Sequence, residues 1–250
     1  MSALGILVGP GVVRDGAVKG LRRFAAEVGC GVVNTWGAKG VFVWDDPFHF
    51  GTAGLQALDF TLAGLADVEV LVTSGLDPDE VTRRPWEGRA EVVDLAPADL
   101  AGAAGLRSWP SGTLERPALY TELAAVCGPL YTSTASPPPA AQRAAALAGE
   151  LPEGGLVVAE PGLVGFWVAR TFPTSVPGSV CVPATGGAEA AWALARRAAV
   201  SGRTVTLVSD AAPPAEVTAG GVRSEVWGDG SVELDPSALV AVAGDIVAWA

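Results

Sequence analysis

One stretch, residues 32–75, constrains the fold more than any other part of the chain. It begins with a short apolar run at residues 32–35 and ends with a second one at residues 68–73. Between them, leucines recur at helical spacing from Leu55 to Leu65. A strand, a crossover helix and a second strand in this order build a parallel α/β sheet. The stretch therefore predicts a parallel sheet in the first half of the chain.

The remaining sequence repeats this alternation of apolar runs and helical segments. Further strands are predicted at residues 4–8, 91–95, 155–159, 180–182, 204–208 and 246–249, with weaker ones at 222–227 and 231–234. Helices are predicted from an N-cap at Asp15 to Gly29, and at residues 117–127, 140–151, 165–170, 188–200 and 236–242. Turn-forming residues dominate residues 105–116.

This element order predicts the α/β class, with two Rossmann-like three-layer α/β/α halves and mostly parallel sheets. We expect a first domain at residues 1–105, a linker and helix at 106–139, and a second α/β domain at 140–250.

The charge of the chain restricts its partners. Acidic residues outnumber basic ones by 27 to 16, for a net charge of −11. A chain this acidic is repelled by nucleic-acid phosphates and by anionic membrane surfaces, so we expect neither as a partner. Asp245 interrupts the last apolar run, and no run reaches the length of a transmembrane helix.

The three cysteines, Cys30, Cys127 and Cys181, are odd in number and show no CxxC spacing. With His49 as the only histidine, they do not make a zinc site. Buried free thiols in a reducing cytosol explain them best. The first residues lack the positively charged start of a signal peptide. We therefore expect a cytoplasmic protein.

A series of short motifs follows the strand at residues 32–35. A Gly-Lys-Gly-like turn, Ala38-Lys39-Gly40, is followed by an Asp-Pro step at residues 46–47 and a Gly-x-x-Gly at residues 51–54. A strand beginning with Ala66-Asp67 then ends at Gly75. In order and spacing, this series resembles the central domain of the thiamine diphosphate enzymes of the acetolactate synthase and pyruvate decarboxylase group. In that family, the domain binds FAD or ADP in some members and no ligand in many others.

The second half extends the resemblance. A strand ends in Glu160-Pro161-Gly162, a glycine turn opens the helix at residues 188–200, and a later strand ends in Ser209-Asp210-Ala211. Residues 140–210 resemble a reduced copy of the family domain that holds the diphosphate and Mg²⁺. The resemblance implies thiamine diphosphate and Mg²⁺ as cofactors, with Asp210 as a metal ligand. It implies these cofactor-binding candidates: Glu160, Gly162, Gly186, Gly187, Asp210 and Lys39.

Three departures from the family pattern limit the expected activity. The sequence has no counterpart of the pyrimidine-binding domain, which supplies the cofactor-activating Glu in the family. The family's Gly-Asp-Gly is replaced by Ser209-Asp210-Ala211, no Asn completes the metal site, and about 40 residues follow Asp210. A single Asp is a poor Mg²⁺ site, because Mg²⁺ demands near-octahedral oxygen ligands.

We therefore assign no catalytic residue and expect a truncated relative that is not active alone. It is either a degenerate homologue, a pseudoenzyme, or one subunit of a split thiamine diphosphate-dependent lyase or synthase. In the second case a partner subunit carries the pyrimidine-binding domain.

Three residues or motifs leave alternatives open. Gly228-Asp229-Gly230 is either a displaced metal motif or a hairpin turn between residues 222–227 and 231–234, and Asp-Gly between strands favours the hairpin. Lys39 lies in a glycine-rich turn and is either a phosphate ligand or a solvated loop cation. His49 fits a hydrogen-bonded structural histidine better than a general base, because no nucleophile lies beside it in the sequence.

Two further hypotheses come from other classes of function. One is a nucleotide-binding module for FAD, ADP or CoA, since the glycine turns at Gly11 and Gly186-Gly187 precede helices whose N-termini could hold an anion. These turns could equally be plain turns. The other is a ligand-free interaction protein. Because the family assembles as dimers, we expect a homodimer.

Overall fold

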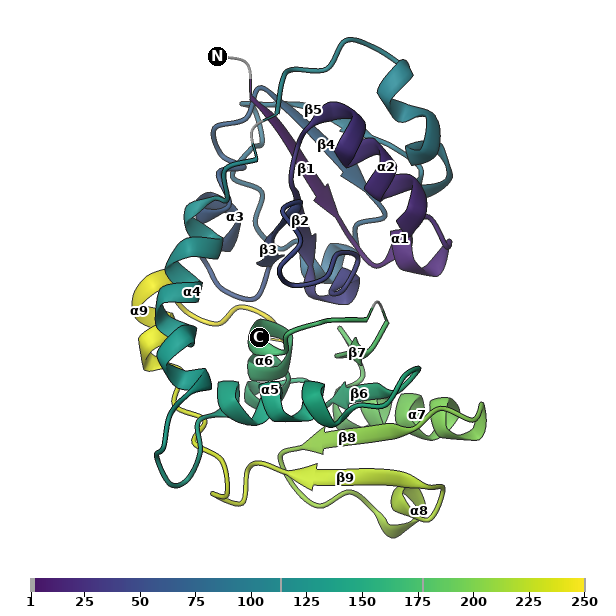
Figure 1. Ribbon diagram of the computed structural model, residues 1–250, viewed down its shortest axis with the longest axis vertical. Helices are drawn as coiled ribbons and strands as arrows, with labels where there is room; N and C mark the ends of the chain where they lie inside the picture. The colour runs from purple at the N-terminus through teal and green to yellow at the C-terminus, as the bar shows by residue number, and fades with distance from the viewer. Residues whose placement is uncertain (1–2, 113, 177, 250) are drawn as a thin grey trace.

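The computed structural model describes residues 3–112, 114–176 and 178–249, which form two β-sheets, one in each half of the chain (Figure 1). The first sheet has the strand order β3-β2-β1-β4-β5, and the second has the order β7-β6-β8-β9. All neighbouring strands in both sheets are parallel. The predicted α/β fold with two parallel sheets is therefore confirmed.

Helical segments cover both faces of the first sheet. Its strands are β1 (Leu4–Val8), β2 (Val32–Thr35), β3 (His49–Ala53), β4 (Val70–Ser74) and β5 (Glu91–Asp94). Its helical segments are α1 (Gly11–Arg14), α2 (Val18–Val28), α3 (Asp59–Leu62) and the 3-10 helices η1 (Trp36–Ala38), η2 (Pro78–Glu80) and η3 (Pro97–Gly105). Along β1 the side chains alternate: Leu7 faces the core that contains α3, whereas Ile6 and Val8 face the core under α2.

The second sheet has the same layered construction. Its strands are β6 (Leu156–Ala159), β7 (Val180–Cys181), β8 (Val205–Ser209) and β9 (Val222–Val226). The helices of this half are α4 (Ala118–Tyr131), α5 (Ala140–Glu150), α6 (Leu163–Thr171), α7 (Gly187–Val200), α8 (Ala215–Thr218) and α9 (Ser237–Ala243). Along β6, Val157 and Ala159 pack toward α5 and α6, and Leu156 and Val158 pack toward α7.

The segment after β2 differs from the long helix predicted at residues 55–65. Residues 49–53 form β3, which pairs with β2, and α3 is a single turn of helix. The Asp59 carboxylate accepts hydrogen bonds from the backbone amides of Leu55 (2.8 Å) and Gln56 (3.0 Å). These bonds hold the residues before α3 in a turn, so the leucine spacing does not continue as a helix.

The predicted hairpin around Gly228-Asp229-Gly230 is wrong, although these residues do form a turn. The strand before it, β9, pairs in parallel with β8. Beyond the turn, Glu233 makes only an isolated parallel bridge to Pro139. The Ser231 amide donates a hydrogen bond to Asp229 Oδ1 (2.9 Å), which stabilises the turn without a returning strand.

Two other predicted boundaries also differ from the structure. Helix α2 begins after Ala17 without a side-chain cap, because Asp15 instead ends the preceding α1. The apolar residues 246–249 do not form a strand, since Ile246 makes a single antiparallel bridge to Gln56 as the chain crosses back to the first half.

The two halves share one apolar core. A single cluster of buried side chains includes Leu7 and Leu71 from the first sheet and Val157 and Val208 from the second. Figure 1 shows α4 and α9 side by side at the edge of the molecule, between the two sheets. None of the described helices is both long and apolar enough to cross a membrane.

Candidate functional site

Glu160 links two loops at the carboxyl end of the second sheet. Its side chain is buried and directly follows β6. Oε1 accepts a hydrogen bond from Trp192 Nε1 (2.6 Å), and Oε2 accepts one from the Asp210 amide (3.0 Å). Trp192 lies on α7, which follows β7, and Asp210 follows β8, so Glu160 connects the segments that leave the two strands on either side of β6. α/β proteins bind ligands at this end of their sheets, and the region around Glu160, Asp210 and Gly186-Gly187 is termed the carboxyl edge below.

Asp210 is exposed at the carboxyl edge and lies against the turn after β9. A Cβ atom added to Gly228 would lie 2.3 Å from Asp210 Oδ1, so only glycine allows this approach. The Gly228-Asp229-Gly230 segment thus lies beside Asp210, the aspartate of the similar motif Ser209-Asp210-Ala211. In the described part of the chain, no three His, Cys, Asp or Glu side chains are grouped so as to hold a metal ion.

The predicted glycines also lie at this edge. Gly186 and Gly187 open α7 with φ angles of 84° and 57°, and Gly162 precedes α6 with φ of 106°. Residues other than glycine rarely adopt these backbone angles. The structure therefore brings five of the six predicted cofactor-binding residues to one end of the second sheet. Lys39 is the exception.

In the first half, the backbone amides of the Gly9-Pro10-Gly11 turn are hydrogen bonded to other backbone groups. The Gly9 amide donates to the Ser74 carbonyl (2.9 Å), and the Gly11 amide donates to the Gly75 carbonyl (2.8 Å). A Cβ atom on Gly9 would lie 2.5 Å from the Gly75 oxygen. These two amides, which a nucleotide phosphate would need, are already hydrogen bonded. Gly9-Pro10-Gly11 is therefore a tight turn that packs against the end of β4.

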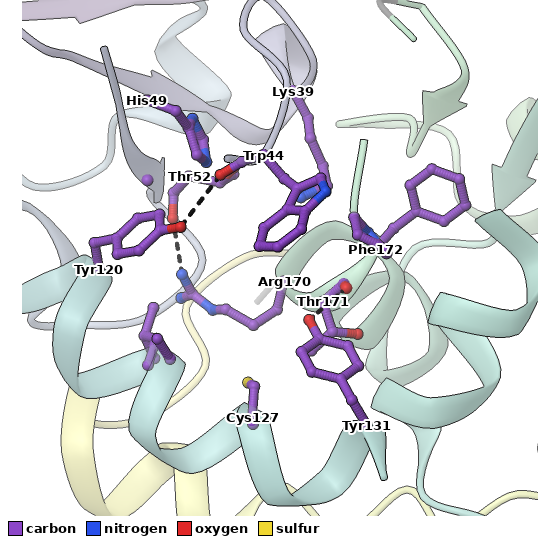
Figure 2. A pocket seen from close by; sticks show the side chains of 15 residues that line it. Lys39, Trp44, His49, Thr52, Tyr120, Cys127, Tyr131, Arg170, Thr171 and Phe172 are labelled. Carbon is purple, nitrogen blue, oxygen red and sulfur yellow. Dashed lines mark hydrogen bonds between the residues drawn. The ribbon is translucent and has the colours of Figure 1, made fainter. Parts of the chain in front are cut away.

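Lys39 lines a cavity of about 280 Å³ between the two halves, termed the interdomain pocket (Figure 2). One wall comes from the loop after β2 and from β3, a second from α4, and a third from the end of α6. Figure 2 labels these lining side chains: Lys39, Trp44, His49, Thr52, Tyr120, Cys127, Tyr131, Arg170, Thr171 and Phe172. The loop of residues 36–50 thus contributes directly to a pocket.

The charge of Lys39 is weakened by its surroundings. Burial and the nearby positive charge of Arg170 lower the pKa of Lys39 to about 7, with a smaller opposing effect from Cys127. Burial raises the pKa of the Cys127 thiol to about 11. At neutral pH, the pocket therefore contains a lysine that is about half neutral and a protonated thiol.

Arg170 connects α6 of the second half to the first half. Its Nη2 donates to both carboxylate oxygens of Asp59 (2.8 and 2.9 Å), and Nη1 donates to the Thr52 carbonyl (2.8 Å). Both side chains of this ion pair are at least 98% buried, since 2% of Arg170 and 0% of Asp59 is exposed. Nε of Arg170 is also buried, and none of the described residues accepts a hydrogen bond from it. Its N–H is thus a donor that the described protein groups leave unsatisfied.

His49 is neutral in this environment. Burial, together with smaller effects from the charges of Lys39 and Arg116, lowers its pKa to about 3. Its ring packs edge-on against Tyr120, with centroids 5.9 Å apart. Its buried Nδ1 atom has no hydrogen-bond partner among the described residues, so His49 is packed as a structural histidine but is not fully hydrogen bonded by them. This unpartnered nitrogen belongs to a residue that lines the pocket.

Sequence reasoning missed the part of the pocket that comes from α4 and α6. Cys127 and Tyr131 carry no motif, because they meet the loop after β2 only when the halves pack together. Arg170 did carry a signal: it is the one charged residue in the otherwise apolar helix α6. Charged side chains are rarely buried unless they are paired, so a lone arginine in such a helix indicates a buried partner.

The comparisons with known proteins agree with this fold. The family model described as thiamine pyrophosphate enzyme, central domain, matches residues 3–102. No curated protein sequence matches the chain. Among solved structures, a candidate thiamin diphosphate-dependent enzyme isolated from Mycobacterium smegmatis is similar, with a TM-score of 0.63 and 16% sequence identity. The match covers 83% of this chain and 44% of that one, so the chain spans less than half of that relative.

Proposed function

We propose that this chain, which belongs to the thiamine diphosphate-dependent enzyme family through its central domain at residues 3–102, is not active on its own. The isolated chain is expected not to perform thiamine diphosphate chemistry. It is either a noncatalytic homologue or one subunit of an enzyme whose partner completes the site. The family implies thiamine diphosphate as the cofactor. The observation that carries the proposal is that, of the two carboxylates at the carboxyl edge, Glu160 is hydrogen bonded within the protein and Asp210 is exposed.

The residues at the carboxyl edge do not fit a magnesium diphosphate group as they stand. Both oxygens of Glu160 already accept hydrogen bonds within the protein, from Trp192 and from the Asp210 amide. Glu160 is also buried and held in place by these bonds, whereas Asp210 is exposed, so Asp210 is the carboxylate more accessible to a metal. Mg²⁺ is held through carboxylates together with phosphate oxygens and water, in near-octahedral geometry. One exposed aspartate supplies too few ligands to bind Mg²⁺ tightly at such a site.

The proposal is tested by assaying the isolated chain for decarboxylation and carboligation of small 2-oxo acids with thiamine diphosphate and Mg²⁺. We expect no turnover above the protein-free control. Robust turnover by the isolated chain would refute the proposal.

Calorimetric titration with thiamine diphosphate then separates the two forms of the proposal. Binding that requires Mg²⁺ and is weakened at least tenfold by Asp210→Ala, but not by the nearby Asp229→Ala, supports a subunit that awaits a partner. The absence of binding in both the presence and the absence of Mg²⁺ supports a noncatalytic homologue. The expected homodimer is measured on the same samples by light scattering.

A further inference from the structure

We propose that the interdomain pocket is a binding site for a small organic carboxylate with an apolar body, and that Lys39 takes up a proton when this anion binds. The site is separate from the carboxyl edge, because none of Glu160, Asp210, Gly186 and Gly187 lines the pocket. The inference stands independently of whether thiamine diphosphate binds.

Two nitrogen groups in the pocket wall lack an acceptor. Arg170 is held rigidly by Thr52 and Asp59, yet its buried Nε–H has no hydrogen-bond partner. Lys39 makes no hydrogen bond or ion pair with the residues that the structure describes, and it is half-buried. A buried donor without an acceptor is unfavourable, as at Arg170 Nε, and the half-buried amine of Lys39 is open to a ligand in the cavity, so acceptor oxygens supplied there would pair with it. A carboxylate supplies two.

The charges around Lys39 favour an anion over a neutral ligand. Asp59 neutralises Arg170 in a buried ion pair. His49, Cys127 and Tyr131 in the lining are uncharged at neutral pH, because burial lowers the pKa of His49 and raises the pKa values of Cys127 and Tyr131. No Asp or Glu is among the described residues that line the pocket, so Lys39 has no counterion among them.

Arg116 adds positive charge near the pocket. Its guanidinium lies over the Tyr120 ring, 4.3 Å from the centroid, and donates to the carbonyl oxygens of Asp45 and Asp46 (both 3.0 Å). Its charge also helps to lower the pKa of His49. The Arg116 cation therefore offsets the neighbouring carboxylates of Asp45 and Asp46, and Asp59 offsets Arg170, so the positive charge of Lys39 remains to attract an anion.

The size and the walls of the pocket select the rest of the ligand. A cavity of about 280 Å³ lies at the small end of the usual range of ligand sites, roughly 300–1,000 Å³. Trp44, Leu123 and Phe172 contribute apolar surface to it. Such walls favour a compact apolar body, and they disfavour a phosphate, whose further oxygens would be buried without partners.

Binding of the anion is coupled to protonation of Lys39. Without ligand, burial and Arg170 lower the Lys39 pKa to about 7, so above neutrality the amine is mostly uncharged. A bound carboxylate favours the ammonium form and raises this pKa. Below pH 7 the affinity is then constant. Above pH 7 it falls toward tenfold per pH unit, because each binding event must draw a proton from the buffer.

The test is calorimetric titration of the full chain with benzoate from pH 6 to pH 9, in two buffers of different ionisation enthalpy. We expect a Kd below about 1 mM at pH 6.5, together with proton uptake that approaches one per site near pH 8. The neutral analogue benzamide and inorganic phosphate should each bind at least tenfold more weakly. Proton uptake is measured on the unaltered protein, so this arm does not depend on any variant folding.

Matched variants assign the effect to Lys39. Lys39→Met should abolish the proton uptake and weaken benzoate binding at least tenfold at pH 6.5. Lys19→Met changes the other lysine of the chain, which is exposed on α2, and should leave both unchanged. Absence of benzoate binding, binding without proton uptake, equal affinity for benzamide, or tighter binding of phosphate would each overturn the proposal.

Discussion

Glu80 is a buried carboxyl group whose ionisation opposes folding. Only 3% of the residue is exposed, at the end of η2, and it accepts a hydrogen bond from the Gly37 amide (3.2 Å). Burial nevertheless raises the pKa of Glu80 from 4.5 to about 7. Between these two values the folded protein keeps a proton that the unfolded chain has lost. The free energy of unfolding therefore decreases as the pH rises through this window, and the loss is complete above about pH 7.

Replacing Glu80 with Gln should remove this pH dependence. Glutamine has nearly the same shape and no charge, so the Glu80→Gln protein should gain stability relative to the unaltered protein as the pH rises from 5 to 8. The gain should approach about 3 kcal/mol, from a pKa difference of about 2.5 units. Urea unfolding at several pH values measures it. Glu153→Gln, at an exposed position, is the control, and an equal gain in that variant would contradict the explanation.

At the scale of whole elements, the Arg170–Asp59 pair fastens α6 to α3 across the two halves. Arg170→Met leaves the Asp59 carboxylate buried without its counterion, so we expect a loss of about 3–5 kcal/mol in the free energy of unfolding. Denaturant unfolding measures this loss. The double variant Arg170→Met, Asp59→Asn should be less destabilised than the sum of the two single variants, because no unpaired charge remains.

Arg223→Met provides the comparison on the surface of the second half. Arg223 pairs with Glu150 and Glu225 (2.9 and 2.8 Å), and its side chain is 53% exposed. Exposed ion pairs contribute little, so this change should reduce the free energy of unfolding by less than about 1 kcal/mol. Equal losses for Arg170→Met and Arg223→Met would show that burial of the Arg170 pair has no special effect.

Elements that depend on local pattern could be predicted from the sequence, and those that depend on distant contacts could not. The run that became β1 is continuous and apolar because both faces of this strand are buried. Strand β3, with the sequence HFGTA, lacks such a pattern and is a strand because it pairs with β2. Gly228-Asp229-Gly230 has the sequence of a hairpin turn, yet the strand before it, β9, pairs with β8 and not with the residues after the turn.

The same division holds for the candidate sites. Glu160 and Asp210 could be placed together because each follows a strand of one parallel sheet, and their ends must lie at one edge. The interdomain pocket combines the loop after β2 with α4 and α6, which are far apart in the sequence. Only packing of the two halves brings Lys39 near Arg170, so no local pattern could predict the lowered pKa of that lysine.

For the whole molecule, the continuous core and the last segment of the chain join the halves into one cooperative unit. The amides of Ala57 and Leu58 donate to the carbonyl oxygens of Asp245 and Ala243 (both 2.9 Å), so the segment after α9 lies along the first half. A chain whose core runs through both sheets should unfold in a single transition. Scanning calorimetry should therefore give a calorimetric enthalpy about equal to the van 't Hoff enthalpy, and two resolved transitions would contradict this.

Trp249 is the side chain through which this coupling can be weakened. Its ring packs against Trp36 of the first half, with centroids 5.2 Å apart, and its Nε1 donates to the Pro183 carbonyl of the second half (2.8 Å). Trp249→Ala removes both contacts. The side chain is half-buried, so we expect a loss of about 2 kcal/mol in the free energy of unfolding, below the 3–5 kcal/mol typical of a fully buried tryptophan.

The shape of the calorimetric transition distinguishes coupling from simple loss of packing. If Trp249 links the halves, the transition of Trp249→Ala should broaden and its van 't Hoff enthalpy should fall below its calorimetric enthalpy, because the halves begin to unfold separately. Trp109→Ala is the control, since Trp109 is also half-buried but packs against Phe24 and donates to the Ala103 carbonyl within the first half, and it should keep the two enthalpies equal. A sharp, merely shifted transition for Trp249→Ala would show that the shared core holds the halves together without this residue.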